Sequence, residues 1–358
     1  MIIDAYSHIC PKGQIERLTK SSDPVLSRSA NRMLMLHDLQ PSFLDVEPRM
    51  KDLDRYSIDL QVAMLNAGQD PNSSRLADIE LLKMTRTVND ECSKLQQSSN
   101  GRLYVMGVVP LSNDPKLMVE EMRRAKKELG LKGFVVFSNY YGKPIDAYTD
   151  FWREAERLNA IVYIHPSNGG NKTTRPYEYD YDLMHVFGWP YETTIMLSRL
   201  IFSGVMKEFP NLKIVSHHMG GMIPFFAARI KENYVRRPRH FVNQDVSRSA
   251  SGKITERVED YGSRGEDALN HASLDKPIFD YFRMFNYDTA LDGSVASIKC
   301  GHDILGADHI VFGTDYSMGP NGGRERLETF PHKVREACVD TGAQRKIFEE
   351  NILRLLNL

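Results

Sequence analysis

Short apolar runs recur along the chain and alternate with longer amphipathic segments. The runs are rich in β-branched and aromatic residues and are bounded by turn residues, a pattern that predicts buried strands. The predicted strands are MIIDAYS, DLQVAMLNA, RLYVMGVVPL, GFVVFSNY, IVYIHP, KIVSHH, FNYDTAL and HIVFGTDYS. The amphipathic segments predict helices over 49–56, 77–97, 115–129, 148–158, 191–209, 223–233, 294–304 and 325–341.

The regular alternation of strand and helix favours parallel βα units. Eight such units can close into a (β/α)8 barrel, the TIM-barrel architecture of the α/β class. Three connections are longer than usual and predict insertions in the βα loops near 10–47, 167–186 and 236–283. No Pro/Gly/Ser-rich linker divides the chain, so we expect residues 1–358 to form one domain.

Composition narrows the classes of partner. The 358 residues include 46 Lys+Arg and 47 Asp+Glu, a balance that gives no electrostatic reason to expect nucleic acid or an anionic membrane. No apolar run approaches the roughly 20 residues that span a bilayer, and the N-terminus does not resemble a secretory signal. We therefore expect a cytoplasmic protein without a membrane partner. The four cysteines are widely separated and form no C-x-x-C unit, which predicts reduced thiols.

Metal-competent or acid/base side chains stand where four of the predicted strands end. His8 follows the first apolar run, His165 ends IVYI, His217 and His218 follow KIVS, and Asp315 follows HIVFGT. In a (β/α)8 barrel the carboxyl ends of the strands meet on the face that carries active sites. One such residue alone is usually an ordinary polar group, but four in this arrangement predict an active site.

This set of residue types suits metal-assisted chemistry. Imidazole nitrogens and a carboxylate can surround one divalent cation. Asp315 could take a proton from a metal-bound water, and His218 could meet negative charge that develops on a substrate. Nitrogen ligands favour zinc, while the carboxylate and open positions also admit manganese, iron or magnesium.

Long ordered segments of the chain resemble the amidohydrolase superfamily, in its branch of metal-dependent barrel decarboxylases. The segments are EPRMKDLDRYSID, TVNDECSKLQQSSNGRLYVMGVVPL, MVEEMRRAKKELGLKGFVVF, IHP, LSRLIFSGVMKEFPNLKIVSHHMGGMIPF and GADHIVFGTDYSMGP. The resemblance implies metal ligands at His8, His165 and Asp315 and a catalytic histidine at His218. It also implies that the chain forms a homodimer or a higher homo-oligomer, since dimers are frequent in this family.

Two further residues follow from the same comparison. Arg49 falls where related decarboxylases hold a substrate carboxylate, although a surface arginine at a helix start explains it equally well. His217 should point to the opposite side of its strand from His218, as a packed or supporting residue.

Tyr6 departs from the family pattern. The family usually has His-x-His at this place, or Glu-x-His in some decarboxylases, whereas this chain has Tyr-x-His. A phenol with a reference pKa near 10 is a poor ligand unless the metal deprotonates it. Either three protein ligands hold the ion, or metal binding is weakened or lost. Tyr6 could instead donate a hydrogen bond to the substrate.

The sequence thus predicts an enzyme that acts on a small-molecule carboxylate. The first hypothesis is a metal-dependent decarboxylase, a carbon–carbon lyase, of a small unsaturated or aromatic acid. The second is a metal-dependent or metal-free hydrolase of an amide or lactone. A barrel that has lost catalysis and serves as a binding or scaffold protein is a third. Retention of His8, His165, His218 and Asp315 argues against it.

Overall fold

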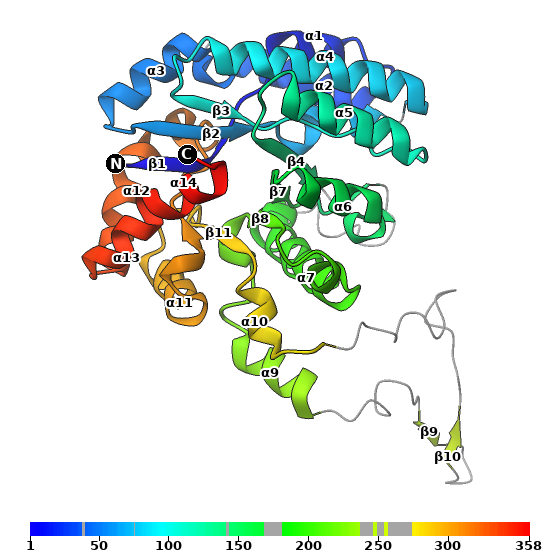
Figure 1. The fold of residues 1–358 in the computed structure, drawn as a ribbon. Coiled ribbons are helices and arrows are strands. Elements are labelled where there is room, and N and C mark those ends of the chain that lie inside the picture. The colour runs from blue at the N-terminus through cyan, green and yellow to red at the C-terminus, as the bar shows by residue number, and fades with distance from the viewer. Residues whose placement is uncertain are drawn as a thin grey trace.

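Eight parallel strands form the centre of the molecule in the computed structural model (Figure 1). The structure describes residues 1–37, 40–74, 76–140, 143–167, 181–236, 246–248, 254–256 and 274–358. The barrel strands are β1 (Ile3–His8), β2 (Leu60–Met64), β3 (Leu103–Val105), β4 (Gly133–Phe137), β7 (Ile161–His165), β8 (Lys213–Ser216), β11 (Asn286–Asp288) and β12 (Ile310–Val311).

Two bridges close these strands into a barrel. Continuous pairing gives the orders β1-β2-β3 and β4-β7-β8-β11-β12. Gly107, beyond β3, pairs in parallel with Phe134 of β4, and Ser7 of β1 pairs in parallel with Tyr316 beyond β12. Every strand runs in the same direction around the ring, so all carboxyl ends lie on one face. The predicted (β/α)8 barrel is confirmed.

Helices surround the strands (Figure 1). They are α1 (Lys12–Thr19), α2 (Pro24–His37), α3 (Val46–Arg55), α4 (Asp78–Gln97), α5 (Pro115–Lys127), α6 (Thr149–Arg157), α7 (Trp189–Phe202), α8 (Val205–Glu208), α9 (Ala227–Arg236), α10 (Ile278–Phe282), α11 (Val295–Leu305), α12 (Arg324–Ala337), α13 (Thr341–Arg345) and α14 (Asn351–Leu356). The short strands β5 (Asn139–Tyr140), β6 (Lys143–Pro144), β9 (Val246–Arg248) and β10 (Ile254–Glu256) lie outside the barrel.

Local chemistry explains where helix α5 begins and ends. The Asp114 carboxylate accepts a hydrogen bond from the backbone N–H of Lys116, and Pro115 occupies the first helical position. Both features satisfy or remove backbone donors that lack a partner at a helix start. The last turn carries Arg124, Lys126 and Lys127, which the carboxyl end of the helix dipole favours.

The three predicted insertions have different outcomes. The insertion at 10–47 contains α1 and α2, and an ion pair between Arg17 and Glu91 (2.6 Å) ties α1 to α4. Most of the insertion at 167–186 and much of that at 236–283 lie outside the described residues. The expectation of a single domain stays a prediction.

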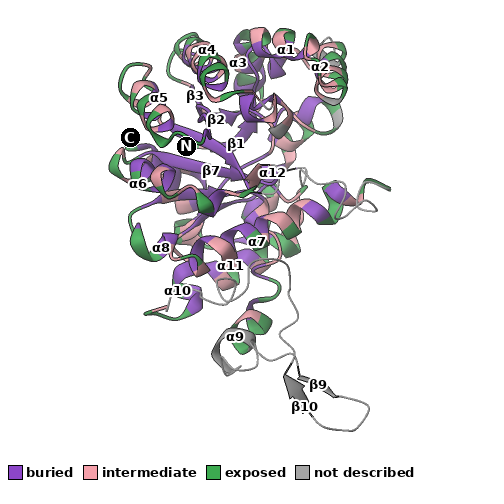
Figure 2. Cartoon of the chain, turned by 90° about the vertical axis from the view of Figure 1, so that its right-hand side faces the viewer, coloured by how far each residue is buried: buried purple, intermediate pink, exposed green. Residues whose placement is uncertain are grey.

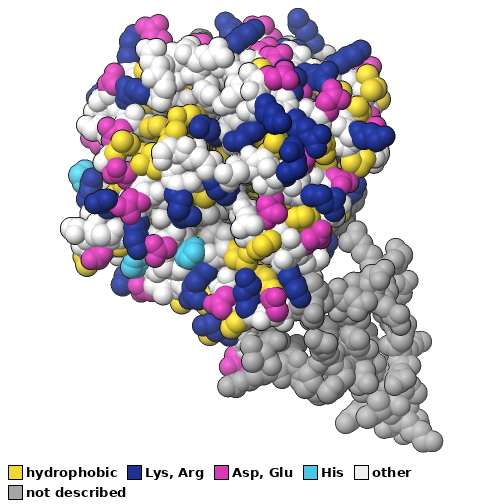
Figure 3. Space-filling view, viewed as in Figure 1, with side chains coloured by type: hydrophobic (Ala, Val, Ile, Leu, Met, Phe, Trp, Pro, Cys, Tyr) yellow, Lys and Arg dark blue, Asp and Glu magenta, His cyan; other side chains and the backbone are white. Residues whose placement is uncertain are grey.

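Burial follows the barrel architecture. The strands are buried, while the helices present both buried and exposed faces (Figure 2). On the face drawn in Figure 3, basic and acidic side chains are interspersed, in keeping with the formal net charge of -1. Across the described residues, no helix has the length and apolar character needed to cross a membrane.

Candidate active site

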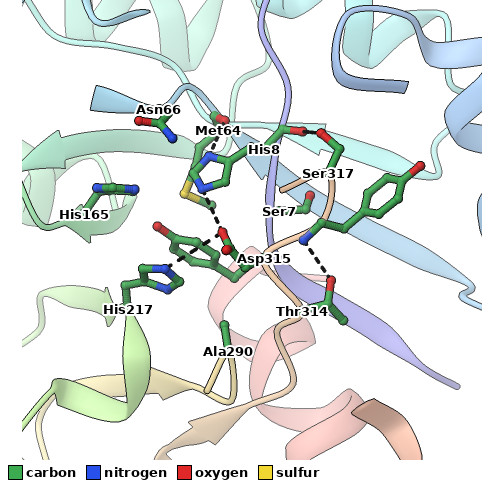
Figure 4. A network of polar contacts seen from close by, with 12 residues as sticks. Ser7, His8, Met64, Asn66, His165, His217, Ala290, Thr314, Asp315 and Ser317 are labelled. Atoms are coloured by element: carbon green, nitrogen blue, oxygen red, sulfur yellow. Dashed lines mark hydrogen bonds and ion pairs between the residues drawn. The ribbon is translucent and has the colours of Figure 1, made fainter. Parts of the chain in front are cut away.

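The groups predicted at the strand ends come together at the carboxyl face of the barrel. His8 is the last residue of β1, His165 the last of β7, and His217 follows β8. Asp315 follows β12, and its side chain reaches the same place (Figure 4). The side chains of His8, His165 and His217 are each about 1% exposed. The predicted convergence of strand ends is therefore present.

His8 joins the first strand to the last. Its Nδ1 lies 3.3 Å from the carbonyl oxygen of Met64, at the end of β2, and its Nε2 lies 3.0 Å from Asp315 Oδ1. Because a carbonyl can only accept a hydrogen bond, Nδ1 carries a proton. Nε2 is the nitrogen directed at the carboxylate.

His165 has the same orientation. Its Nδ1–H donates to the carbonyl oxygen of Pro166 at 2.6 Å. Burial, together with the neighbouring His8 and His217, lowers the pKa of His165 well below its usual value, so the imidazole is neutral. Its ring centroid lies 5.4 Å from that of His8 and 5.6 Å from that of His217. Nε2 is therefore unprotonated and available as a ligand.

Asp315 is held from two sides. Oδ1 faces His8, whereas Oδ2 accepts a hydrogen bond from Nη1 of Arg326 at 2.6 Å. Burial by itself would raise the pKa of Asp315, but the contacts with His8, His217 and Arg326 outweigh it and hold the pKa well below the usual carboxyl range. Asp315 is thus ionised, and one of its two oxygens, Oδ1, remains directed at the histidines as a possible metal ligand.

His217 differs from its expected orientation. It turns into the site, with Nε2 4.0 Å from Asp315 Oδ1 and Nδ1 2.7 Å from Asp288 Oδ2. The expectation that it points away was wrong because β8 ends at Ser216, so the alternation of a strand does not extend to the next two residues. His218 has a left-handed backbone with φ 54°.

His218 lies beside His217 nearer the surface. Its backbone N–H donates to Asp288 Oδ1 at 3.1 Å, and its ring is stacked 6.3 Å from that of Trp189. Its buried Nδ1 has no hydrogen-bond partner in the described part of the chain. Burial, with a smaller effect from His217, lowers the pKa of His218 to about 3. It is a neutral imidazole with an unused polar atom.

Tyr6 lies among the histidines, as the Tyr-x-His spacing predicted. Its side chain is fully buried and its hydroxyl has no hydrogen-bond partner among the residues that the structure describes. Its ring stacks on His217 with 3.8 Å between centroids and meets His8 edge-on at 5.5 Å. Burial, then the charges of Asp288 and Asp315, raise the pKa of Tyr6 well above 10. Tyr6 is a neutral phenol here.

Arg49 does not reach the cluster with a free guanidinium. The side chain is fully buried beneath the site, where its nitrogens donate to the backbone oxygens of His8 and Ser42 (the latter at 3.1 Å) and to Gln61. The guanidinium also lies 4.9 Å from the Tyr316 ring. These bonds occupy most of its donors, so the geometry does not support the prediction that Arg49 holds a substrate carboxylate. The alternative of a surface arginine is wrong as well.

Sequence reasoning missed Arg326. It lies on α12, eleven positions after Asp315, and its Nη2 also donates to Asp292 Oδ1 at 2.6 Å. No motif in RERLETF marks it, because its role depends on how α12 returns to the barrel mouth. Asp288, by contrast, ends the strand β11 in the same way that His8 and His165 end theirs, so its place at this face follows from the strand pattern.

The residue types in the site suit a divalent cation, because imidazole nitrogen and carboxylate oxygen are ligand atoms that such ions take. Two imidazoles with Nδ1 committed to backbone carbonyls and Nε2 directed inward, beside an ionised carboxylate, match how metal-binding histidines are oriented. As they stand, no three or more His, Cys, Asp or Glu side chains in the described residues form a group that could hold a metal ion. His8 and Asp315 instead contact each other directly. An ion would replace that contact.

The chain is similar to known proteins over most of its length. The family model described as amidohydrolase matches residues 37–358. The chain is 29% identical over 253 residues to 2-amino-3-carboxymuconate-6-semialdehyde decarboxylase of Dictyostelium discoideum, covering 66% of this chain and 67% of that protein. It is 34% identical over 215 residues to γ-resorcylate decarboxylase of Rhodococcus jostii, covering 54% of this chain and 62% of that protein.

A solved structure shares the fold over its full length. The crystal structure of dihydroxybenzoic acid decarboxylase from Polaromonas sp. JS666, with bound manganese and the inhibitor 2-nitroresorcinol, has a TM-score of 0.73 and 22% sequence identity. The match covers 100% of this chain and 97% of that chain. The likeness supports the barrel fold.

Proposed function

The chain belongs to the amidohydrolase family, and from this membership we propose that it is a metal-dependent decarboxylase. It would be a carbon–carbon lyase that removes CO2 from a small aromatic or unsaturated carboxylic acid. The similarity to the two decarboxylases supports this choice within the family.

The observation that carries the proposal is the shared orientation of the site histidines around one carboxylate. The Nδ1 atoms of His8 and His165 both lie against backbone carbonyl oxygens, so that their Nε2 atoms are directed into the site. Asp315 is kept ionised, and its contact with His8 Nε2 is the one that an ion would replace. A scaffold has no need for such an arrangement, whereas metal-assisted catalysis does.

We expect His8, His165 and Asp315 to hold one divalent ion. When bound, such an ion supplies positive charge for the substrate's carboxylate and an adjacent oxygen. Zinc is the prediction from the nitrogen donors, and the manganese in the Polaromonas structure makes Mn²⁺ the other ion to test.

In decarboxylation, the bond to the carboxylate carbon breaks, CO2 leaves, and the electron pair that stays on the substrate carbon takes up a proton from solvent. We assign to Asp315 the transfer of that proton, because its carboxylate faces the site beside His8. His218 has a neutral ring and a polar atom without a described partner, so it is suited to meet the developing negative charge. The Tyr6 hydroxyl would donate a hydrogen bond to the substrate.

The test is product analysis with carboxyl-labelled acids, 2,6-dihydroxybenzoate among them, in Mn²⁺ and in Zn²⁺. We expect labelled CO2 and, in D2O, one deuterium at the vacated carbon. His8→Ala and Asp315→Asn should abolish both signals, whereas Arg335→Gln, on the same helix as Arg326 but outside the site, should retain them.

The contrary outcome is also defined. If no acid releases CO2 while lactones or amides are opened with uptake of water, the protein is a hydrolase and the proposal fails. Activity that survives exhaustive chelation would remove the requirement for a metal.

A further inference from the structure

Two aromatic rings lie face to face at the centre of the site. The Tyr6 ring and the His217 imidazole have centroids 3.8 Å apart and planes inclined by only 10°. Both side chains are buried, with exposed fractions of 0% and 1%. The contact uses the face of the Tyr6 ring and leaves its hydroxyl unengaged. Tyr6 therefore limits the tilt of the His217 ring.

Asp288 limits the rotation of the same imidazole. Asp288 Oδ2 lies 2.7 Å from His217 Nδ1, while Oδ1 accepts backbone N–H bonds from His218 and Ala290 at 3.1 and 2.9 Å. Those two backbone bonds fix the carboxylate, and the carboxylate fixes which nitrogen of His217 points away from it. The remaining nitrogen, Nε2, faces Asp315.

His217 thus repeats the arrangement of the two expected ligands. In His8, His165 and His217 alike, Nδ1 is bound to an oxygen and Nε2 is directed to the interior. The oxygen is a backbone carbonyl in the first two and a carboxylate in the third. A carboxylate on the outer nitrogen of an imidazole is a frequent support for a metal-binding histidine.

Two distances in the site match those between ligand atoms that share one ion. Two ligand atoms bound to one cation at about 2.1 Å lie roughly 3.0 to 4.2 Å apart, depending on the angle between the bonds. Asp315 Oδ1 is 3.0 Å from His8 Nε2 and 4.0 Å from His217 Nε2.

We propose that His217 is an additional ligand of the divalent ion and that Tyr6 and Asp288 are the residues that position it. The two adjacent histidines then divide the work: His217 turns inward to the ion, and His218 remains for the substrate. Tyr6 contributes a platform rather than an oxygen ligand. The inference rests on the metal site of the proposed function, but its test does not require a substrate.

The first measurement counts imidazoles on the intact wild-type protein. The protein is loaded with one equivalent of Cu²⁺, and pulsed electron paramagnetic resonance reports how many histidine nitrogens couple to the ion. Three coupled imidazoles are expected. Two would overturn the inference without any variant, while leaving the ligands His8, His165 and Asp315 in place.

The second measurement compares the affinity of variants for Mn²⁺ by calorimetry. Loss of a supporting residue typically costs 10- to 100-fold in metal affinity, so loss of a ligand in His217→Asn should cost at least about 100-fold. The matched control His218→Asn should remain within about threefold of wild type. Equal affinity of His217→Asn and wild type would overturn the inference.

Variants of the two positioning residues distinguish the role of the Tyr6 ring from that of its hydroxyl group. Tyr6→Phe keeps the stack and should leave Mn²⁺ affinity unchanged, whereas Tyr6→Leu and Asp288→Asn should each weaken it by about 10-fold or more. Weakening in Tyr6→Phe equal to that in Tyr6→Leu would make the hydroxyl a ligand and refute the platform. If His217→Asn binds Mn²⁺ with wild-type affinity but His8→Ala does not bind it, this inference fails while the proposed metal site survives.

Discussion

At the scale of single residues, Asp315 depends on a partner from another element. Arg326 holds Oδ2, which leaves Oδ1 toward the histidines. Arg326 is held in turn by Asp292, and a Cβ on Gly319 would come within 3.0 Å of its guanidinium, so the chain packs closely around it. The guanidinium therefore has little freedom, and this rigidity is passed on to the carboxylate.

Replacing Arg326 should lower the affinity of the site for Mn²⁺. In Arg326→Gln, Asp315 loses the bond that fixes its second oxygen, and Mn²⁺ affinity should fall by about 10- to 100-fold. Arg326→Lys keeps the charge but cannot bond both carboxylates in the same geometry, so it should restore affinity only in part. Calorimetry with Mn²⁺ measures both.

The control for this prediction is Arg335→Gln on the same helix. It should bind Mn²⁺ as wild type does. If Arg326→Gln also binds Mn²⁺ normally, Asp315 needs no support from α12.

Some site residues could be predicted from the sequence and others could not. The predicted places of His8, His165 and Asp315 follow from strand ends alone, because parallel strands in a barrel deliver their last residues to one face. The geometry does not support the predicted role of Arg49 as a substrate-binding residue. Its sequence position does not reveal that its guanidinium is buried and donates to backbone oxygens. The orientation of His217 depends on the end of β8 at Ser216, and no pattern in KIVSHH reveals where the strand ends.

At the scale of elements, the pairing of β4 with β7 delivers His165 to the site. The register pairs Gly133 with Ile161 and Phe137 with His165. Gly133 fits because a Cβ there would lie 1.8 Å from the Ile161 carbonyl oxygen. A slip of one residue would turn His165 to the opposite face of the sheet.

Gly133→Ala should therefore strain this strand pair. The added methyl group meets backbone that cannot move aside without breaking the ladder, so we expect a loss of about 3 kcal/mol in unfolding free energy. Urea denaturation measures the loss, and Mn²⁺ calorimetry shows whether the remaining folded protein keeps His165 in place.

Gly68→Ala is the matched substitution. A Cβ at Gly68 would meet only Ser29 Oγ at 3.7 Å, an ordinary contact, and the change should stay within about 0.5 kcal/mol. Equal stability of the two variants would mean that β4 and β7 can separate slightly at no cost.

Elements were predictable where the hydrophobic pattern is regular. All eight predicted strands correspond to barrel strands, since continuous apolar runs reflect burial on both faces. Helices α1 and α2 fall in a segment that was predicted only as an insertion. Pro11, Gly13 and Pro24 in this segment are residue types typical of loops, so the pattern did not indicate helices. Tertiary contacts such as the Arg17–Glu91 pair stabilise α1 there.

At the scale of the whole molecule, closing the barrel buries carboxyl groups whose protonation then affects global stability. Asp70, beyond β2, is 1% exposed, and burial raises its pKa to about 6 although Oδ1 accepts two hydrogen bonds from Asn72. Sequence alone could not foresee this, because DPN reads as an ordinary turn.

The sign of the effect on stability follows from linkage. A carboxyl group whose pKa is higher in the folded than in the unfolded protein favours folding below pH about 4, where both states are protonated on this group. That contribution is lost as the pH rises through 6, because the unfolded chain ionises Asp70 more easily. The difference between 3.8 and about 6 corresponds to a loss of about 3 kcal/mol by pH 7.5.

Asp70→Asn removes this pH dependence while keeping an oxygen for the two bonds from Asn72. Relative to wild type, the unfolding free energy of Asp70→Asn should therefore rise between pH 4 and pH 7.5, by up to about 3 kcal/mol. Urea denaturation at several pH values measures the difference. A difference for Asp70→Asn that does not change with pH would mean that Asp70 ionises as freely in the folded barrel as in the unfolded chain.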